Sequence, residues 1–159
     1  MDRATRLVIS NQLEILKHLN PDRAEDYDLQ QDIIRSGYTS RYNEVFAELS
    51  EDEADAKMQE EVWDILGMFR ALHYARKRGW SPSDPDAATY EGFDANHDPH
   101  QWFAGHLLDK SGLFVELAPN KNSHNSASLL KYRRMLKVWK QAEDAYDMTD
   151  VEAEAIITA

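Results

Sequence analysis

The amino-acid sequence predicts an all-α protein of six to eight helices, folded as a single domain over residues 1–159. Apolar residues recur at helical spacing through most of the chain. Helix-capping patterns of the Asn-Pro, Asp-Pro and Thr-x-x-Glu kinds separate the apolar segments. No internal repeat and no linker-like stretch interrupts this order. The length suits one domain with a substantial core.

One long helix, at about 51–79, is expected to be the centre of the fold. Ser50 and Glu53 have the spacing of a capping box, in which each residue satisfies the other's backbone N–H. Gly79 follows three basic residues, which is typical of a helix end.

This long helix carries two apolar faces. The larger face is predicted to pack in the core, and the opposite face holds Trp63, Gly67 and Tyr74. A helix that is apolar on two sides lies between two partners. Glycine inside a helix costs about 0.5–1 kcal/mol relative to alanine, so Gly67 indicates a close approach by another helix. We expect Trp63, Gly67 and Tyr74 at an interface between subunits, and a contact within one subunit is the alternative.

The N-terminal helices follow from apolar spacing and from their caps. A first helix is predicted at about 3–19, with Val8, Ile15, Leu16 and Leu19 on one face. Asn20-Pro21 places a cap before a proline, so a second helix should begin there and end near Ser36. Apolar residues between 42 and 49 mark a short third helix.

The C-terminal half begins with a stretch, 80–98, that is rich in proline and is expected to be irregular and exposed. A helix should follow Asp98-Pro99 and run to about 111. A short extended piece at 113–117 and a polar loop at 119–126 lead to a helix at 128–144. Thr149 and Glu152 form a second capping box for a last short helix.

Charge is unevenly distributed along the chain. The net charge of −11 favours solubility and disfavours a polyanionic partner. Residues 117–142 contain six basic residues and no acidic one, and residues 143–159 contain six acidic residues and no basic one. We expect these two blocks to face each other, either within a subunit or across an interface. No apolar run is long enough to span a bilayer, so no membrane partner is expected. The absence of cysteine is compatible with the cytoplasm.

Several sequence blocks together resemble the YfbU family of bacterial proteins. They occur in the family's order and cover most of the chain: Arg6-Leu7, Ser10-Asn11-Gln12, Ile33-Ile34, Gly37-Tyr38, Asp64-Ile65, Ala71-Leu72-His73, Gly92-Phe93-Asp94-Ala95, Tyr132, Arg134-Met135-Leu136 and Val138-Trp139. The resemblance implies a multihelical cytoplasmic protein that self-associates. It implies no activity and no catalytic residues.

Two polar residues are expected on apolar helix faces. Gln12 falls between Val8 and Ile15, where a buried amide needs hydrogen-bond partners. His73 lies at the edge of the main face of the long helix, without an evident nucleophile or carboxylate nearby in sequence. A structural role is favoured for both residues over a role in binding or catalysis.

The sequence predicts a self-associating interaction or regulatory protein with no identifiable catalytic set, no cofactor and no metal. One alternative is a metal-assisted hydrolase or ligand-binding enzyme that uses residues 80–106. The potential ligands there are Asp94, His97, Asp98, His100 and His106, at spacing that fits no metal motif. A second alternative is nucleic-acid binding through the basic helix at 128–144. An unidentified protein partner is also compatible with the pattern.

Overall fold

The computed structural model describes residues 1–117 and 122–159, and it divides the chain into two compact units, Met1–Glu53 and Ala54–Ala159. Each unit is described by itself. The described residues form helices, turns and one isolated bridge between Phe93 and Asn122, so the predicted all-α class is confirmed. That the whole chain forms one cooperative domain stays a prediction.

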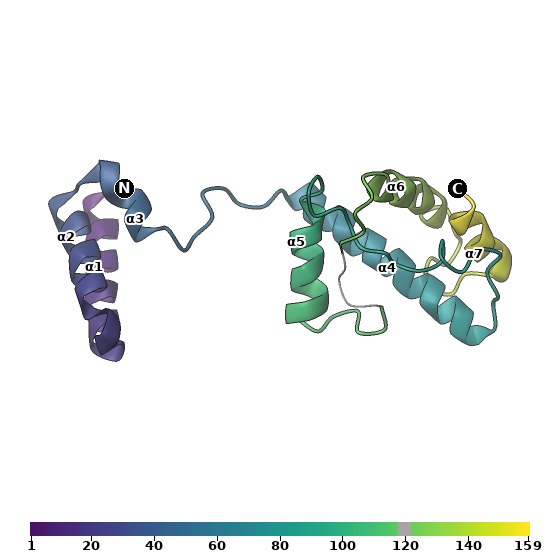
Figure 1. Ribbon diagram of the computed structural model, residues 1–159, viewed down its shortest axis with the longest axis horizontal. Helices are drawn as coiled ribbons and strands as arrows, with labels where there is room; N and C mark the ends of the chain where they lie inside the picture. The colour runs from purple at the N-terminus through teal and green to yellow at the C-terminus, as the bar shows by residue number, and fades with distance from the viewer. Residues whose placement is uncertain (118–121) are drawn as a thin grey trace. The chain divides into compact units, whose positions relative to one another are not determined.

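The first unit is a helical hairpin with a short third helix (Figure 1). Its helices are α1 (Arg3–Leu19), α2 (Ala24–Ser36) and α3 (Tyr42–Val45), with single 3-10 turns at Pro21–Arg23 and Thr39–Arg41. α1 and α2 pack along each other. The buried cluster between the helices is small: Leu13, Tyr27 and Ile34, joined by partly buried Ile9, Tyr42, Val45 and Phe46.

The helix ends of this unit follow local sequence signals. Asp2 caps α1 by accepting a hydrogen bond from the backbone N–H of Thr5 at 2.8 Å. Gly37, at φ 73°, ends α2 in the left-handed conformation that glycine adopts without strain. Asn20-Pro21 opens a 3-10 turn, and the α-helical part of α2 begins three residues later than predicted.

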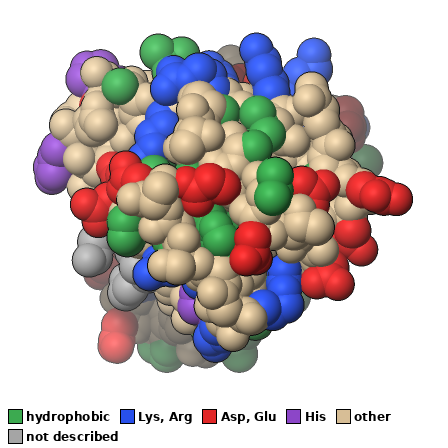
Figure 2. All heavy atoms as spheres, turned by 90° about the vertical axis from the view of Figure 1, so that its right-hand side faces the viewer, with side chains coloured by type: hydrophobic (Ala, Val, Ile, Leu, Met, Phe, Trp, Pro, Cys, Tyr) green, Lys and Arg blue, Asp and Glu red, His purple; other side chains and the backbone are tan. Residues whose placement is uncertain are grey.

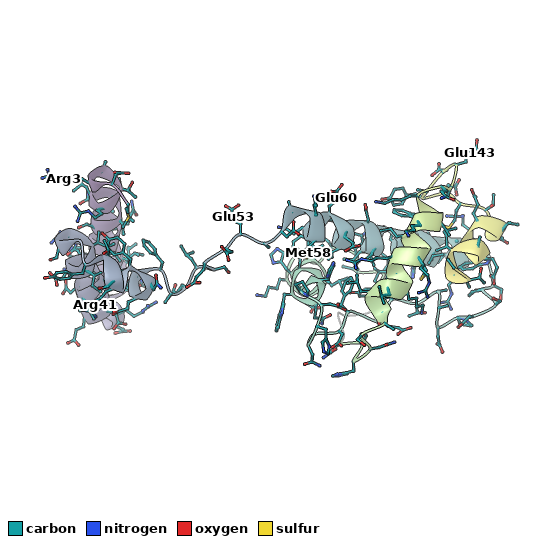
Figure 3. All side chains as sticks on the ribbon, turned by 90° about the horizontal axis from the view of Figure 1, so that it is seen from above. Arg3, Arg41, Glu53, Met58, Glu60 and Glu143 are labelled. Carbon is teal, nitrogen blue, oxygen red and sulfur yellow. The ribbon has the colours of Figure 1, made fainter. Side chains whose placement is uncertain are left out.

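The second unit is organised around α4 (Ala56–Arg78). Around it lie α5 (His100–Gly105), α6 (Ser128–Trp139) and α7 (Asp150–Ile157), and all three contact α4 (Figure 1). Met58 packs against the core and the exposed Glu60 points to the other side of the first turns of α4 (Figure 3). Gly79 ends α4 as predicted, with φ 119°.

The predicted start of the long helix is wrong. Ser50 and Glu53 do not cap it, and residues 50–55 lie exposed outside any helix. Asp55 is the cap instead, because its carboxylate accepts a hydrogen bond from the N–H of Lys57 at 2.9 Å. No large apolar residue occurs between Ser50 and Met58, so an extra helical turn there would bury nothing.

The segment 80–98 is irregular, as predicted, and many of its polar residues are exposed, but its apolar side chains are buried. Its apolar side chains Trp80, Ala87, Ala88, Tyr90 and Phe93 belong to the main core. Tyr132 of α6 fixes the segment, because its hydroxyl donates to the carbonyl of Gly92 at 3.0 Å and accepts from the N–H of Glu91 at 3.1 Å. Prolines and glycines signal irregular backbone but carry no information about burial.

Three further boundaries differ from the predictions. The helix after Asp98-Pro99 is α-helical only for six residues and continues as one π-helical turn, His106–Lys110. Residues 113–117 form turns instead of an extended piece, and α6 ends at Trp139 instead of 144. The predicted loop at 119–126 lies partly outside the described residues. Among the described helices, none combines the length and the apolar character that a membrane span requires.

Candidate functional site

α1 buries one face and exposes an apolar opposite face. The buried face holds Ser10 and Leu13, which pack against α2. On the other side, Val8, Ile15 and Leu19 are 58%, 51% and 70% exposed. At about 100° per residue these three side chains lie within roughly 40° of one another. We call Val8, Ile15 and Leu19 the α1 stripe. Aligned apolar side chains in water mark an interaction surface more often than a free surface.

The first unit has a small core and further exposed apolar side chains, among them Leu7, Leu29 and Leu49. Its core cluster has only three fully buried members, and a helical unit of about this size gains little stability from so small a core. What distinguishes the α1 stripe is that its three apolar side chains share one side of a single helix, so that one partner could bury them together.

The predicted burial of Gln12 is wrong, since Gln12 is exposed and lies within the α1 stripe. The buried amide of this helix pair is Gln31 of α2, which donates to the carbonyl of Ser10 at 2.8 Å and to a carboxylate oxygen of Glu14 at 3.1 Å. The spacing of Tyr27, Gln31 and Ile34 on one face of α2 is the signal that sequence inspection missed.

The second face of α4 is partly covered from within the same unit. Gly67 is buried, and a Cβ at this position would lie 3.2 Å from the hydroxyl of Tyr146 and 3.5 Å from Trp139. Trp139 is the last residue of α6 and Tyr146 follows α6, so both neighbours belong to the same chain. Gly67 therefore makes a contact within one subunit, which was the alternative to a subunit interface.

Trp63 and Tyr74 have different surroundings from Gly67. Trp63 packs against the rings of Phe103 and Phe114, at centroid distances of 6.5 and 5.5 Å. Tyr74 has Lys77 over its ring at 5.8 Å. The two side chains are 43% and 44% exposed, so a contact with another subunit at Trp63 and Tyr74 stays a prediction.

His73 is half-buried, as its position on α4 suggested. Its ring packs edge-on against Tyr74 at 5.4 Å, and its Nε2 is buried with no hydrogen-bond partner among residues 1–117 and 122–159. No serine, threonine or carboxylate in the described chain is hydrogen-bonded to this nitrogen, although the carboxylate of Glu116 lies close enough to His73 for their charges to interact.

A partly buried ion network that sequence inspection missed is centred on Glu61 of α4. Arg133 binds both carboxylate oxygens of Glu61, at 2.7 and 2.9 Å, and Nε2 of His100 lies 2.8 Å from the same group. The hydrogen bond from Arg133, and then that from His100, lowers the pKa of Glu61 against the opposing effect of burial. The network joins three segments that lie about forty and seventy residues apart, and no local pattern connects them.

The potential metal ligands at 94–106 are divided among separate partners. His97 Nδ1 lies 2.6 Å from the buried carboxylate of Asp94, His100 pairs with Glu61, and His106 lies 3.2 Å from the hydroxyl of Ser111. The backbone N–H of Asn96 and then His97 lower the pKa of Asp94. Within the described ranges, no three histidine or carboxylate side chains meet in a group that could hold a metal ion.

The basic helix α6 pairs with other elements than the acidic tail, contrary to the prediction. Lys140 contacts Asp64 and Arg133 contacts Glu61, both on α4, while Lys131 lies 3.2 Å from Glu91. Arg134 donates to the main-chain oxygen of Ala159 at 3.0 Å. α6 packs against α7 as well as α4, but most of its paired basic side chains contact α4 and Glu91 instead of the carboxylates of residues 143–159. On the face of the second unit seen in Figure 2, basic side chains gather along the upper edge and near the bottom, and acidic side chains lie across the middle between them. A phosphate backbone that crossed this face would meet carboxylates, which disfavours it as a partner.

These features define an all-helical protein whose described part carries structural ion networks and an exposed apolar helix face, with no assembled catalytic or metal-binding set. Comparison with protein families identifies a YfbU domain over residues 1–159. The chain therefore belongs to the YfbU family, as the sequence blocks suggested.

Proposed function

We propose that this protein acts by self-association, and that a second copy covers the α1 stripe. The observation that carries the proposal is the alignment of Val8, Ile15 and Leu19 on the side of α1 that faces away from α2. Apolar burial is the main favourable term in protein association, and an exposed stripe on a small hairpin provides it.

The positions along α1 fit an antiparallel pair of α1 helices related by a twofold axis. If the axis passes between residues 11 and 12, Val8 of one copy lies against Ile15 of the other, and Ala4 lies against Leu19. Each contact then occurs twice, which is the property of a symmetric dimer interface. Two α1–α2 hairpins joined in this way form a four-helix bundle.

The same arrangement gives Gln12 a role. It places Gln12 of one copy opposite Asn11 of the other at the centre of the apolar contact. Two side-chain amides can donate and accept hydrogen bonds with each other, so neither is left unpaired when buried. A polar pair of this kind fixes the register of two helices at some cost in stability.

The proposal is tested by measuring the mass of the full chain with light scattering after size-exclusion chromatography. The wild-type chain should exceed the 18.4 kDa of one copy. Ile15→Glu should return it to the monomer mass, because the charge would be buried without a partner. Leu29→Glu on α2 is the matched control: Leu29 is 49% exposed against 51% for Ile15, and it lies outside the stripe.

Helical content by circular dichroism should be the same for both variants, which separates loss of assembly from loss of folding. A monomeric wild-type chain at micromolar concentration contradicts the proposal. An Ile15→Glu chain that keeps the wild-type mass contradicts it equally.

A further inference from the structure

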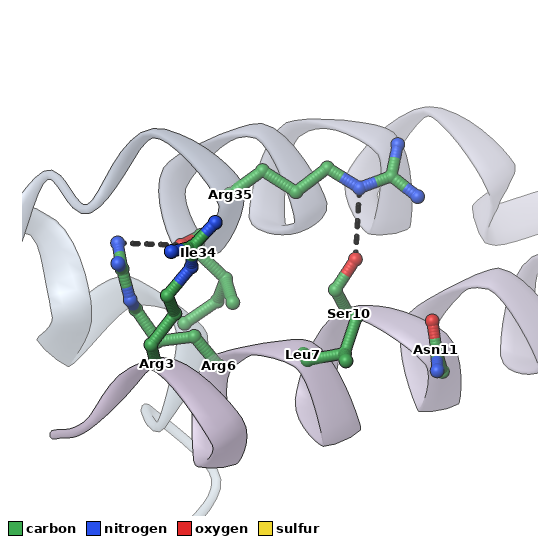
Figure 4. A pocket seen from close by; sticks show the side chains of 7 residues that line it. All are labelled: Arg3, Arg6, Leu7, Ser10, Asn11, Ile34 and Arg35. Atoms are coloured by element: carbon green, nitrogen blue, oxygen red, sulfur yellow. Dashed lines mark hydrogen bonds between the residues drawn. The ribbon is translucent and has the colours of Figure 1, made fainter.

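Three arginines line one pocket between α1 and α2. Arg3 and Arg6 project from the first turns of α1, and Arg35 projects from the end of α2 (Figure 4). The pocket has a volume of about 300 Å³ and is completed by Leu7, Ser10, Asn11 and Ile34. We call this site the arginine pocket. Arg6 and Ser10 lie about 160° around α1 from Val8, so the arginines of the pocket face away from the α1 stripe, and Asn11 lies at the border between the two surfaces.

Two of the guanidinium groups are held in place by the helix pair. Nε of Arg35 donates to the hydroxyl of Ser10 at 2.8 Å, and a terminal nitrogen of Arg6 lies 3.5 Å from the carbonyl of Ile34 (Figure 4). Gly37 leaves room for Arg6, because a Cβ there would collide with its guanidinium. Each guanidinium has five N–H donors, so most donors of Arg6 and Arg35 stay available.

The arginine pocket lacks negative charge. The other three Lys and Arg residues of the first unit, Lys17, Arg23 and Arg41, each pair with a carboxylate. Arg3, Arg6 and Arg35 have no carboxylate within ion-pair distance among the described residues. In a chain with 29 acidic and 18 basic side chains, three neighbouring unpaired arginines are an unexpected arrangement. The three positive charges repel one another, so an anion bound between them would relieve this repulsion and stabilise the pocket.

We propose that the arginine pocket binds a small phosphorylated molecule, with its phosphoryl oxygens on the guanidinium groups. Arginine matches phosphate because its planar fork donates two parallel hydrogen bonds to two oxygens. The pocket's volume is at the lower limit for small-ligand sites, which suits a compact phosphate ester. Leu7 and Ile34 provide an apolar wall for the remainder of such a molecule. The net charge of −11 opposes a long polyanion.

The test is calorimetric titration of the full chain with pyrophosphate and with inorganic phosphate at low salt. Arg3→Gln is the main variant, since the Arg3 side chain makes no described contact that holds the fold. It should raise the dissociation constant for pyrophosphate about tenfold, because one charge-assisted hydrogen bond typically contributes about that factor to binding. The Arg3→Gln, Arg6→Gln, Arg35→Gln triple variant should not bind.

The matched control is Arg76→Gln on α4. Arg76 also lacks a carboxylate partner among the described residues and makes only a 3.5 Å contact with the hydroxyl of Thr89. This variant carries the same change of net charge and should bind pyrophosphate like the wild type. Equal weakening by Arg76→Gln would show non-specific attraction and would overturn the proposal.

Two further results would overturn it. One is the absence of binding by the wild-type chain at millimolar pyrophosphate. The other is a triple variant that loses the assembly mass while the wild-type chain binds neither phosphate nor pyrophosphate. This result would assign the three arginines to a contact between protein chains. The Ile15→Glu chain should retain pyrophosphate binding, so the failure of either proposal can be recognised independently of the other.

Discussion

Replacing Gly67 by leucine tests the packing on the second face of α4. A Cβ at Gly67 would lie 3.2 Å from the hydroxyl of Tyr146 and 3.5 Å from Trp139, so a leucine must displace at least one ring. Trp139 is buried and its Nε1 donates to the carbonyl of Ala145 at 2.6 Å, so its displacement also costs a hydrogen bond.

The change in the free energy of unfolding combines one stabilising contribution and two destabilising ones. Leaving a helical glycine gains about 0.8 kcal/mol, while overpacking costs about 1–3 kcal/mol and the lost hydrogen bond about 1 kcal/mol. Gly67→Leu should therefore lower the free energy of unfolding by about 2 kcal/mol. Gly67→Ala adds one methyl group beside the mobile end of the exposed Tyr146 and should be nearly neutral, because the helix gain offsets a small displacement.

Tryptophan fluorescence during urea unfolding measures this free energy. All four tryptophans, Trp63, Trp80, Trp102 and Trp139, belong to the second unit, so the signal reports on the unit that contains Gly67. If Gly67 makes an internal contact, Gly67→Leu should lower the urea midpoint and leave the assembly mass unchanged. This expectation is refuted if Gly67→Leu unfolds at the wild-type midpoint. A lower mass at an unchanged midpoint would support the intersubunit prediction for Gly67.

Two other predictions concern ionisable and capping groups. The pKa of Glu61 in the folded chain is below its ordinary value of 4.5, so its stabilising effect is present above that value and is lost as the pH falls through the lowered pKa. Thermal unfolding midpoints measured between about pH 5 and pH 3 should fall more steeply for the wild type than for Glu61→Gln, and parallel profiles would contradict this. Thr149→Ala should cost about 1 kcal/mol, because it removes the hydroxyl that accepts a hydrogen bond from the N–H of Glu152, while the backbone N–H of residue 149 can still donate to the Glu152 carboxylate. Thr158→Ala, beyond the end of α7, should cost less, and equal urea midpoints for these two variants would argue against the capping effect.

Features that depend on a few adjacent residues were predictable from the sequence. The bounds of α1, the left-handed glycines that end α2 and α4, and the capping box of α7 all agree with the prediction. Each is decided by backbone hydrogen bonds within one or two turns. The false capping box at Ser50 shows the limit of such signals, because a cap forms only where burial stabilises the helix that follows it.

The candidate sites depended on residues far apart in the chain. The α1 stripe was visible as a pattern, but the sequence assigned the apolar face with Val8 and Ile15 to the core. The structure buries the face with Ser10 and Leu13 instead, because that face matches α2. Likewise, the arginine pocket needs Arg35 beside Arg6, which is a consequence of the hairpin and of no local motif.

The sequence by itself determined the helical class of this YfbU-family protein, most of its helix ends and the existence of two apolar faces on α4, since these follow from local propensity and periodicity. Only the tertiary structure decided which faces are covered. Gly67 lies beneath Tyr146 and Trp139, and the carboxylates of α4 pair with the basic side chains of α6. The physical reason is that burial and ion pairing depend on which helices and loops are in contact. Those contacts are determined by the packing of the whole unit and not by any local segment.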